Sequence, residues 1–217
     1  MYNPVAFREE NPEAIRTLIE RYPLATLVTM SSSGLAATHL PLLYTPAGDG
    51  PGVLRGHLAR ANPQWQDLAR LDALAIFSGP DHYVSPAWYP SKREHGKVVP
   101  TWNYVVVHAH GTVRFIEDPA WLLENVRALS EFHEKSHGTG WNVADAPPEF
   151  IANQLRSIVG VEFKITSLEG KAKASQNRSA ADREGVIEGL GQSPSTSARE
   201  MAEVVKTKLR GDGKLPA

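Results

Sequence analysis

The sequence contains no cysteine among its 217 residues. A disulfide framework, a thiolate nucleophile and a thiolate metal site are therefore excluded. An excess of charge of one sign is also lacking, because 23 Lys and Arg stand against 24 Asp and Glu, for a net charge of −1. This balance gives no general electrostatic reason to expect binding to nucleic acid or to an anionic membrane.

Long apolar runs are missing as well. No run reaches the length of a membrane span, and the start, MYNPVAFREENPEAIR, lacks the pattern of a secretory signal peptide. We therefore expect a cytoplasmic protein without membrane contact. The 41% of hydrophobic and 22% of charged residues are ordinary for a globular chain, and a chain of this length buries a sizeable core.

Capping residues and prolines mark the expected helices. Asn–Pro or Asp–Pro pairs predict helix starts at residues 11, 62 and 118, and Pro147-Pro148 predicts another. Ser179 with Asp182, and Ser197 with Glu200, resemble capping boxes for two helices near the C-terminus.

Alternating or continuous apolar residues between turn signals mark the expected strands. In 159–166, alternation places Val159, Val161, Phe163 and Ile165 on one face. The expected strands cover 24–30, 35–44, 53–59, 73–79, 101–116 and 159–166. Consecutive strands with short loops favour a mainly β fold, an antiparallel sheet or barrel with peripheral helices, over a βαβ fold.

The strand 101–116 has an unusual face. Trp102, Tyr104, His108 and His110 alternate onto one side of it, which is more polar and aromatic than a core strand requires. The spacing of His108 and His110, or of His133 and His137 on a helix, is compatible with a metal ion. No HExxH glutamate or acidic cluster accompanies either pair, so we expect no metal site and interpret these histidines as interface or structural groups.

Two polar stretches are candidate binding segments. In HLARANPQW (57–65) a strand leads to the expected helix start, where free amides and Arg60 suit a phosphate, although a capped surface helix explains the same pattern. KAKASQNR (171–178) contains a dense set of hydrogen-bond donors before a helix cap. A solvated linker would look similar.

Motifs for nucleophilic catalysis and dinucleotide binding are absent. The sequence has no GxSxG, no SxxK and no GxGxxG between a strand and a helix. We therefore assign no catalytic residue. From residue 171 onward nine Lys or Arg face six Asp or Glu, which leaves DNA contact open without a helix-turn-helix signature.

Taken together, HLARANPQW, YVSPAWYP, HGKVVPTWNYVVVHAHG and KAKASQNRSAADREGV resemble the PaiB-like family of FMN-binding negative transcriptional regulators. The likeness runs from the first residues to beyond residue 190. It implies an FMN-binding split β-barrel. We expect this barrel, with peripheral helices, over 1–170 and a C-terminal helical extension packed on it over 171–217. The likeness also implies a homodimer with FMN at the subunit interface.

The resemblance also implies roles for individual residues by their place in the motifs. Arg60 and Asn62 are expected at the FMN phosphate, and Thr38 and His39 near the ring or ribityl chain. Trp102 and Asn103 are expected at the dimer interface beside the ring. A second polar clamp is expected from Lys173, Gln176, Asn177 and Arg178.

The function implied is negative regulation of transcription by an FMN-binding protein. No side chain stands out as an acid, base or nucleophile, which favours a cofactor-binding regulator over a dedicated enzyme. The alternatives are a flavin-dependent oxidoreductase and a haem-binding split barrel, because fold analogy alone does not separate them.

Overall fold

The computed structural model describes residues 1–48, 50–68 and 70–210. The chain forms two compact units. Unit 1 comprises Met1–Tyr22, Phe77–His108 and the chain from Glu169 onward, and unit 2 comprises Pro23–Ile76 and Ala109–Leu168. Three long strands, β6 (Asp72–Val84), β7 (Thr101–Ile116) and β8 (Ile158–Lys173), contribute a segment to each unit.

Unit 2 is built on an antiparallel sheet. Besides its segments of β6, β7 and β8 it contains β2 (Leu24–Ser31), β3 (Gly34–Pro41), β4 (Leu43–Ala47) and β5 (Gly50–Ala59). The strand order is β3-β2-β6-β7-β8-β5-β4, and among the described strands this path is not closed between β3 and β4. The four residues expected on one face of 159–166 are all buried, which confirms that alternation.

Two helices belong to unit 2, α3 (Pro119–His137) and α4 (Pro148–Arg156). Helix α3 begins after Asp118, whose carboxylate accepts a hydrogen bond from the Trp121 amide at 2.7 Å. It packs against β5, where the Asn125 amide donates to the Gly56 carbonyl oxygen.

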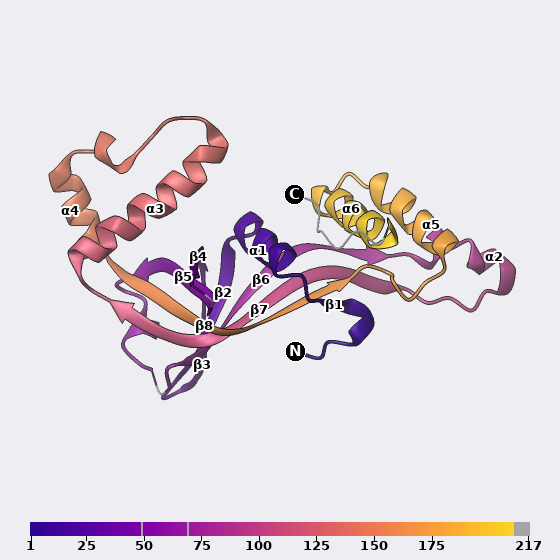
Figure 1. The fold of residues 1–217 in the computed structure, drawn as a ribbon, viewed down its shortest axis with the longest axis horizontal. Coiled ribbons are helices and arrows are strands. Elements are labelled where there is room, and N and C mark those ends of the chain that lie inside the picture. The colour runs from indigo at the N-terminus through magenta and orange to yellow at the C-terminus, as the bar shows by residue number, and fades with distance from the viewer. Residues whose placement is uncertain (49, 69, 211–217) are drawn as a thin grey trace. The chain divides into compact units, whose positions relative to one another are not determined.

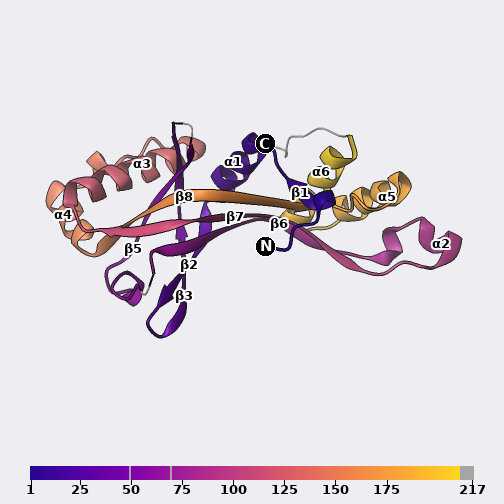
Figure 2. The ribbon, with the colours of Figure 1, turned by 60° about the horizontal axis from the view of Figure 1, so that its bottom comes forward.

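Unit 1 combines strand segments with helices. The helices are α1 (Pro12–Arg21), α2 (Ser91–His95), α5 (Ala180–Gly191) and α6 (Thr196–Arg210), and β1 (Arg8–Glu9) pairs with the end of β8. Figures 1 and 2 show α5 and α6 side by side. Val186, Leu190, Met201 and Val205 are completely buried in this part of the unit.

Two sequence predictions about helices are wrong. The helix expected at Asn62 is a three-residue 3-10 turn, η2 (Pro63–Trp65). Tertiary contacts outweigh the capping signal there, because the Gln64 side chain donates to Leu27 and Thr29 of β2. The expected cap at Ser197 is also misplaced.

Helix α6 instead begins at Thr196, and the Ser195 hydroxyl accepts the Ala198 amide. The Ser197 hydroxyl is used elsewhere, since it donates to the Asp81 carbonyl oxygen and accepts from the Asp81 amide. That pair of bonds fastens α6 to β6 within unit 1.

The strand expected over 73–79 continues to Val84 through Gly79-Pro80-Asp81. Strand β2 pairs with β6 only over residues 73–76. Beyond residue 76 β2 no longer pairs with β6. Pro80, which has no amide N–H, therefore interrupts no hydrogen bond to β2 and does not end the strand.

The fold class expected from the sequence, mainly antiparallel strands with peripheral helices, is confirmed. Strand β8 runs through residue 170 to Lys173, and a domain boundary at residue 170 stays a prediction. In the described ranges no helix combines the length and the apolar character that a membrane span requires.

Candidate functional site

The ten residues expected to bind a cofactor are divided between the two units. Unit 2 holds Thr38, His39, Arg60 and Asn62, and unit 1 holds Trp102, Asn103, Lys173, Gln176, Asn177 and Arg178. Each set is described within its own unit.

In unit 2 the structure brings Thr38 and Asn62 together. The Asn62 side-chain amide donates to the Thr38 hydroxyl oxygen at 2.8 Å, while its carbonyl oxygen accepts the Gln64 amide. His39 follows Thr38 on β3 and therefore points to the opposite side of the strand. It is exposed, and no hydrogen bond to it is recorded within the described residues.

The Arg60 guanidinium already makes hydrogen bonds within unit 2. Its Nε donates to the Arg156 carbonyl oxygen at 2.8 Å and its Nη2 to the Ile158 carbonyl oxygen at 3.1 Å. Its Nη1 pairs with the Glu117 carboxylate at 2.5 Å. A phosphate contact by Arg60 would therefore require at least the Glu117 pair to open.

In unit 1 a buried pair fixes the chain where β8 ends. Asn103 of β7 is fully buried, and its side-chain amide donates to the Ser175 hydroxyl at 2.9 Å. Ser175 has φ of 60°, a left-handed conformation that a side chain rarely adopts. Asn103 thus positions the polar segment, while Trp102, its neighbour on β7, points to the opposite face and is 50% exposed.

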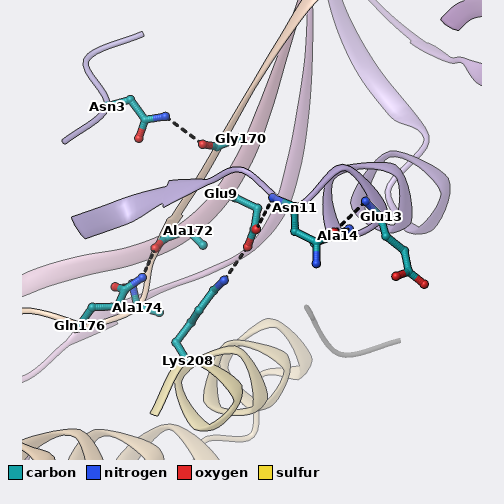
Figure 3. Close-up of polar contacts among 10 residues, drawn as sticks. All are labelled: Asn3, Glu9, Asn11, Glu13, Ala14, Gly170, Ala172, Ala174, Gln176 and Lys208. Carbon is teal, nitrogen blue, oxygen red and sulfur yellow. Dashed lines mark hydrogen bonds and ion pairs between the residues drawn. The ribbon is translucent and has the colours of Figure 1, made fainter. Parts of the chain in front are cut away.

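The segment after β8 is also held by its own side chains. The Gln176 amide donates to the Ala172 carbonyl oxygen at 2.6 Å and its oxygen accepts the Ala174 amide at 2.7 Å (Figure 3). The Lys173 ammonium donates to the Thr101 hydroxyl at 2.5 Å. Two of the four expected clamp residues are therefore used for local structure.

Arg178 and Asn177 are the remaining donors of this segment. The Arg178 guanidinium lies 4.8 Å from the centroid of the Tyr89 ring. Burial raises the pKa of the Tyr89 hydroxyl, and the Arg178 charge opposes that rise. Within the described chain Arg178 has no carboxylate partner, and exposed Asn177 has no recorded hydrogen bond.

Helix α5 begins directly after these two residues. Ser179 is its N-cap, and its hydroxyl accepts the Asp182 amide at 3.2 Å. The first amides of a helix have no partner inside the helix and carry partial positive charge. A guanidinium without a carboxylate partner in the described chain, an exposed amide and a helix start thus adjoin one another in the sequence.

The exposed face of β7 in unit 1 borders a groove of about 630 Å³. Trp102, Tyr104 and His108 line it, together with Tyr2 and Lys171. The groove therefore combines aromatic surfaces with one lysine, Lys171, and one carboxylate, Asp81.

Two side chains of this groove are fixed by their neighbours. The Trp102 indole donates to the Asp81 carboxylate at 2.8 Å. Lys171 is only 7% exposed, donates to the Tyr2 carbonyl oxygen at 3.0 Å and lies over the Tyr2 and Tyr104 rings.

Lys171 was not among the residues expected from the sequence. Its signal was its spacing, since it stands two residues before Lys173 and so shares a face of β8 with it. The sequence alone predicted a strand only as far as residue 166. It therefore did not indicate that Lys171 belongs to β8.

Unit 1 contains both kinds of group that a flat anionic cofactor requires. FMN is a phosphate dianion with a planar amphipathic ring, which requires cations or amides at one end and apolar or aromatic cover at the other. Arg178, Asn177 and the start of α5 offer the first kind of group. Trp102 and Tyr104 offer the second.

Comparison with known proteins agrees with this chemistry. Residues 1–167 match a family described as "Putative FMN-binding domain". The chain is 35% identical over 211 residues to the protease synthase and sporulation protein PAI 2 of Bacillus subtilis, covering 97% of this chain and 99% of that protein. It is 32% identical over 244 residues to an uncharacterized protein of Emericella nidulans, covering 96% and 97%.

Solved structures share the fold at low sequence identity. An FAD and haem binding protein from Mycobacterium smegmatis superposes with a TM-score of 0.54 at 15% identity, covering 76% of this chain and 73% of that one. The flavocytochrome Anf3 from Azotobacter vinelandii gives 0.53 at 16% identity, covering 76% and 69%. These likenesses confirm the split-barrel class of fold, and the family confirms FMN as the expected cofactor. The chain belongs to the PaiB-like family of FMN-binding domain proteins.

Proposed function

We propose that this protein is a cytoplasmic, homodimeric FMN-binding regulator of the PaiB type that represses transcription. The name of the Bacillus subtilis relative, protease synthase and sporulation protein PAI 2, mentions sporulation and supports a regulatory role. The sequence supports it too, because it contains no GxSxG or SxxK motif of nucleophilic catalysis.

The observation that most strongly supports the FMN site is the charge of Arg178, which no carboxylate neutralises among the described residues. Its guanidinium has no carboxylate partner in the described chain, and it directly precedes the cap of α5. Arg178 and Asn177 would bind the phosphate, and the first amides of α5 add partial positive charge. Lys173 and Gln176 would support this contact by shaping the segment.

The ring is assigned to the face of β7 that Trp102 occupies. Trp102 is 50% exposed and Tyr83, which contacts it edge-on, is 43% exposed. A second copy of the chain would cover these aromatic groups, which supports the homodimer. Asn103 acts in this site by positioning Ser175. FMN, when bound, supplies redox chemistry that the side chains themselves lack.

Thr38, His39, Arg60 and Asn62 of unit 2 stay predicted FMN contacts, and each is considered within that unit. Asn62 and Thr38 form a hydrogen-bonded pair, and the Thr38 hydroxyl can still donate to a ligand. His39 is exposed on the other side of β3. Arg60 has the weakest case as a direct phosphate ligand, because its three nitrogens are already engaged.

The cofactor assignment is tested by mass spectrometry of the ligand released from purified protein and by titration with FMN. Arg178→Ala is expected to raise the Kd for FMN about tenfold to a hundredfold, the loss of a charge-assisted hydrogen bond. Arg70→Ala removes an exposed arginine of unit 2 and serves as the matched control. A protein that releases no FMN and binds none would contradict the cofactor, and unchanged affinity in Arg178→Ala would contradict the clamp.

The regulatory role is tested by gel retention of upstream duplexes and by reporter expression with and without the gene. Repression predicts sequence-dependent retention and higher reporter output when the gene is deleted. Sustained oxidation of NAD(P)H by the FMN-loaded protein, without DNA retention, would instead favour the oxidoreductase. A haem absorbance band in the purified protein would favour the haem-binding alternative.

A further inference from the structure

The connection between β6 and β7 concentrates positive charge. Lys92, Arg93 and Lys97 lie within six residues of one another, in α2 and directly after it, and all three are exposed. Glu94 is the single acidic residue of the sequence between Ser91 and Lys97. We call Lys92, Arg93 and Lys97 the basic tip.

The charges of the basic tip are available to a partner. Within the described ranges no side-chain hydrogen bond or ion pair is recorded for any of the three. Some other cations of the described chain are paired, as Lys208 is with Glu9 and Arg55 with Glu162. Unpaired exposed lysines are common singly, but three cations on one short turn form a local positive patch.

The turn that carries these charges is firmly anchored. The Ser91 amide and hydroxyl donate to the two carboxylate oxygens of Asp182 in α5, at 3.1 and 2.9 Å, and Asp182 is only 5% exposed. At the other end Gly96 adopts a φ of 65°, and its amide donates to the Lys92 carbonyl oxygen at 3.1 Å. A fixed backbone lowers the entropy lost when the patch binds a partner.

The basic tip also projects from its unit. Figures 1 and 2 show the loop that carries α2 extending past the end of α5 in both views. The residues from 92 to 97 are all exposed. A rod-shaped polyanion can therefore reach the three side chains without displacing another element of unit 1.

We propose that the basic tip binds the phosphate backbone of double-stranded DNA. This inference rests on the proposed regulatory function, which requires contact with promoter DNA. Because the whole chain has a net charge of −1, general electrostatic attraction cannot supply that contact, and a local cluster of cations must. The basic tip orients the protein on the duplex, because phosphate contacts fix position without reading sequence.

The test compares two triple variants that remove equal charge. Lys92→Ala/Arg93→Ala/Lys97→Ala removes the basic tip, and Arg70→Ala/Lys135→Ala/Lys164→Ala removes three exposed cations of unit 2. Binding to an upstream duplex and to an unrelated duplex of equal length is measured over a series of salt concentrations. FMN titration of both variants checks that they fold, since neither changes a residue assigned to FMN.

The tip variant is expected to bind both duplexes at least about tenfold more weakly. The slope of log K against log salt should fall by about 2.7, from about 0.9 for each of three phosphate contacts. Unchanged affinity in the tip variant, or an equal loss in the control variant, overturns the inference about the basic tip and leaves the regulatory function standing. Preference for RNA of equal length overturns the choice of DNA, and a wild-type protein that binds no duplex refutes the regulatory function itself.

A charge reversal provides a second measurement should the triple variant fail to fold. Arg93→Glu alone is expected to weaken duplex binding more than Arg70→Glu does. Equal affinities for the two reversed variants overturn the assignment.

Discussion

Gly185 of α5 lies so close to Trp88 that a Cβ added to the glycine would stand 2.0 Å from the Trp88 carbonyl oxygen. Gly189, one turn later, meets the Trp88 ring in the same way, at 2.3 Å. The two glycines therefore let α5 pack directly on η3 (Pro86–Trp88). This contact supports both the basic tip and the segment that carries Arg178.

Gly185→Ala should therefore destabilise the protein. Overpacking against backbone costs about 1–3 kcal/mol, more than the gain of about 1 kcal/mol that alanine brings to a helix interior. Gly191→Ala in the same helix is the control, because no other described part of the chain comes within 4 Å of its Cβ position. Urea denaturation should show a lower midpoint for Gly185→Ala and an equal or higher one for Gly191→Ala. A Gly185→Ala protein as stable as wild type would refute the close packing.

Asn103→Ala should weaken both folding and FMN binding. The substitution leaves the buried Ser175 hydroxyl without its partner, at a cost of about 1–3 kcal/mol, and it releases the left-handed turn before Arg178. Ser175→Gly is the comparison, because it breaks the same Asn103 hydrogen bond while glycine tolerates the positive φ, which should offset part of the loss. Calorimetry and FMN titration report the two effects. Normal FMN affinity in Asn103→Ala would show that Asn103 does not position the segment.

Much of the secondary structure could be predicted from local sequence. The strand 101–116 has the predicted bounds, and Asn11-Pro12 begins a helix as expected. Helix caps and apolar alternation depend on residues that are close together in the chain. They can therefore be recognised in the sequence without knowledge of the fold. Asn62-Pro63 displays the same signal and forms only a short turn, because Gln64 is drawn to β2, more than thirty residues earlier in the chain.

The candidate site was less predictable, because the partners of a side chain depend on distant residues. Arg60 was expected to face phosphate, yet it donates to carbonyl oxygens 96 and 98 residues away in the sequence. Arg178 has the same charge and remains free of a carboxylate in the described chain. Composition and motif cannot distinguish these two arginines, and only the fold does.

Arg60→Ala should consequently lower the stability of the protein more than its affinity for FMN. It leaves the part-buried Ile158 carbonyl oxygen without its charged donor, which should cost about 1–3 kcal/mol, while the exposed Arg156 carbonyl oxygen can bond to water. Glu117→Gln is the matched control, because Glu117 is 57% exposed and an exposed ion pair contributes only about 0–1 kcal/mol. Denaturation midpoints should fall clearly for Arg60→Ala and little for Glu117→Gln. A large loss of FMN affinity at wild-type stability would restore Arg60 as a direct phosphate ligand.

His57 should make the stability of the protein sensitive to mild acid. It lies on β5 opposite Gly160 of β8, and its Nδ1 is buried without a hydrogen-bond partner among the described residues. Burial lowers the pKa of His57 from its usual 6.5. The unfolded chain therefore binds more protons at this ring than the folded protein does, so stability is fully present above pH 6.5 and falls as the pH drops below it. Denaturation between pH 5 and 8 should show a smaller loss of stability toward low pH in His57→Gln than in the wild type. The control His39→Gln, which changes an exposed histidine, should keep the wild-type profile. Identical profiles for wild type and His57→Gln would contradict this role of His57.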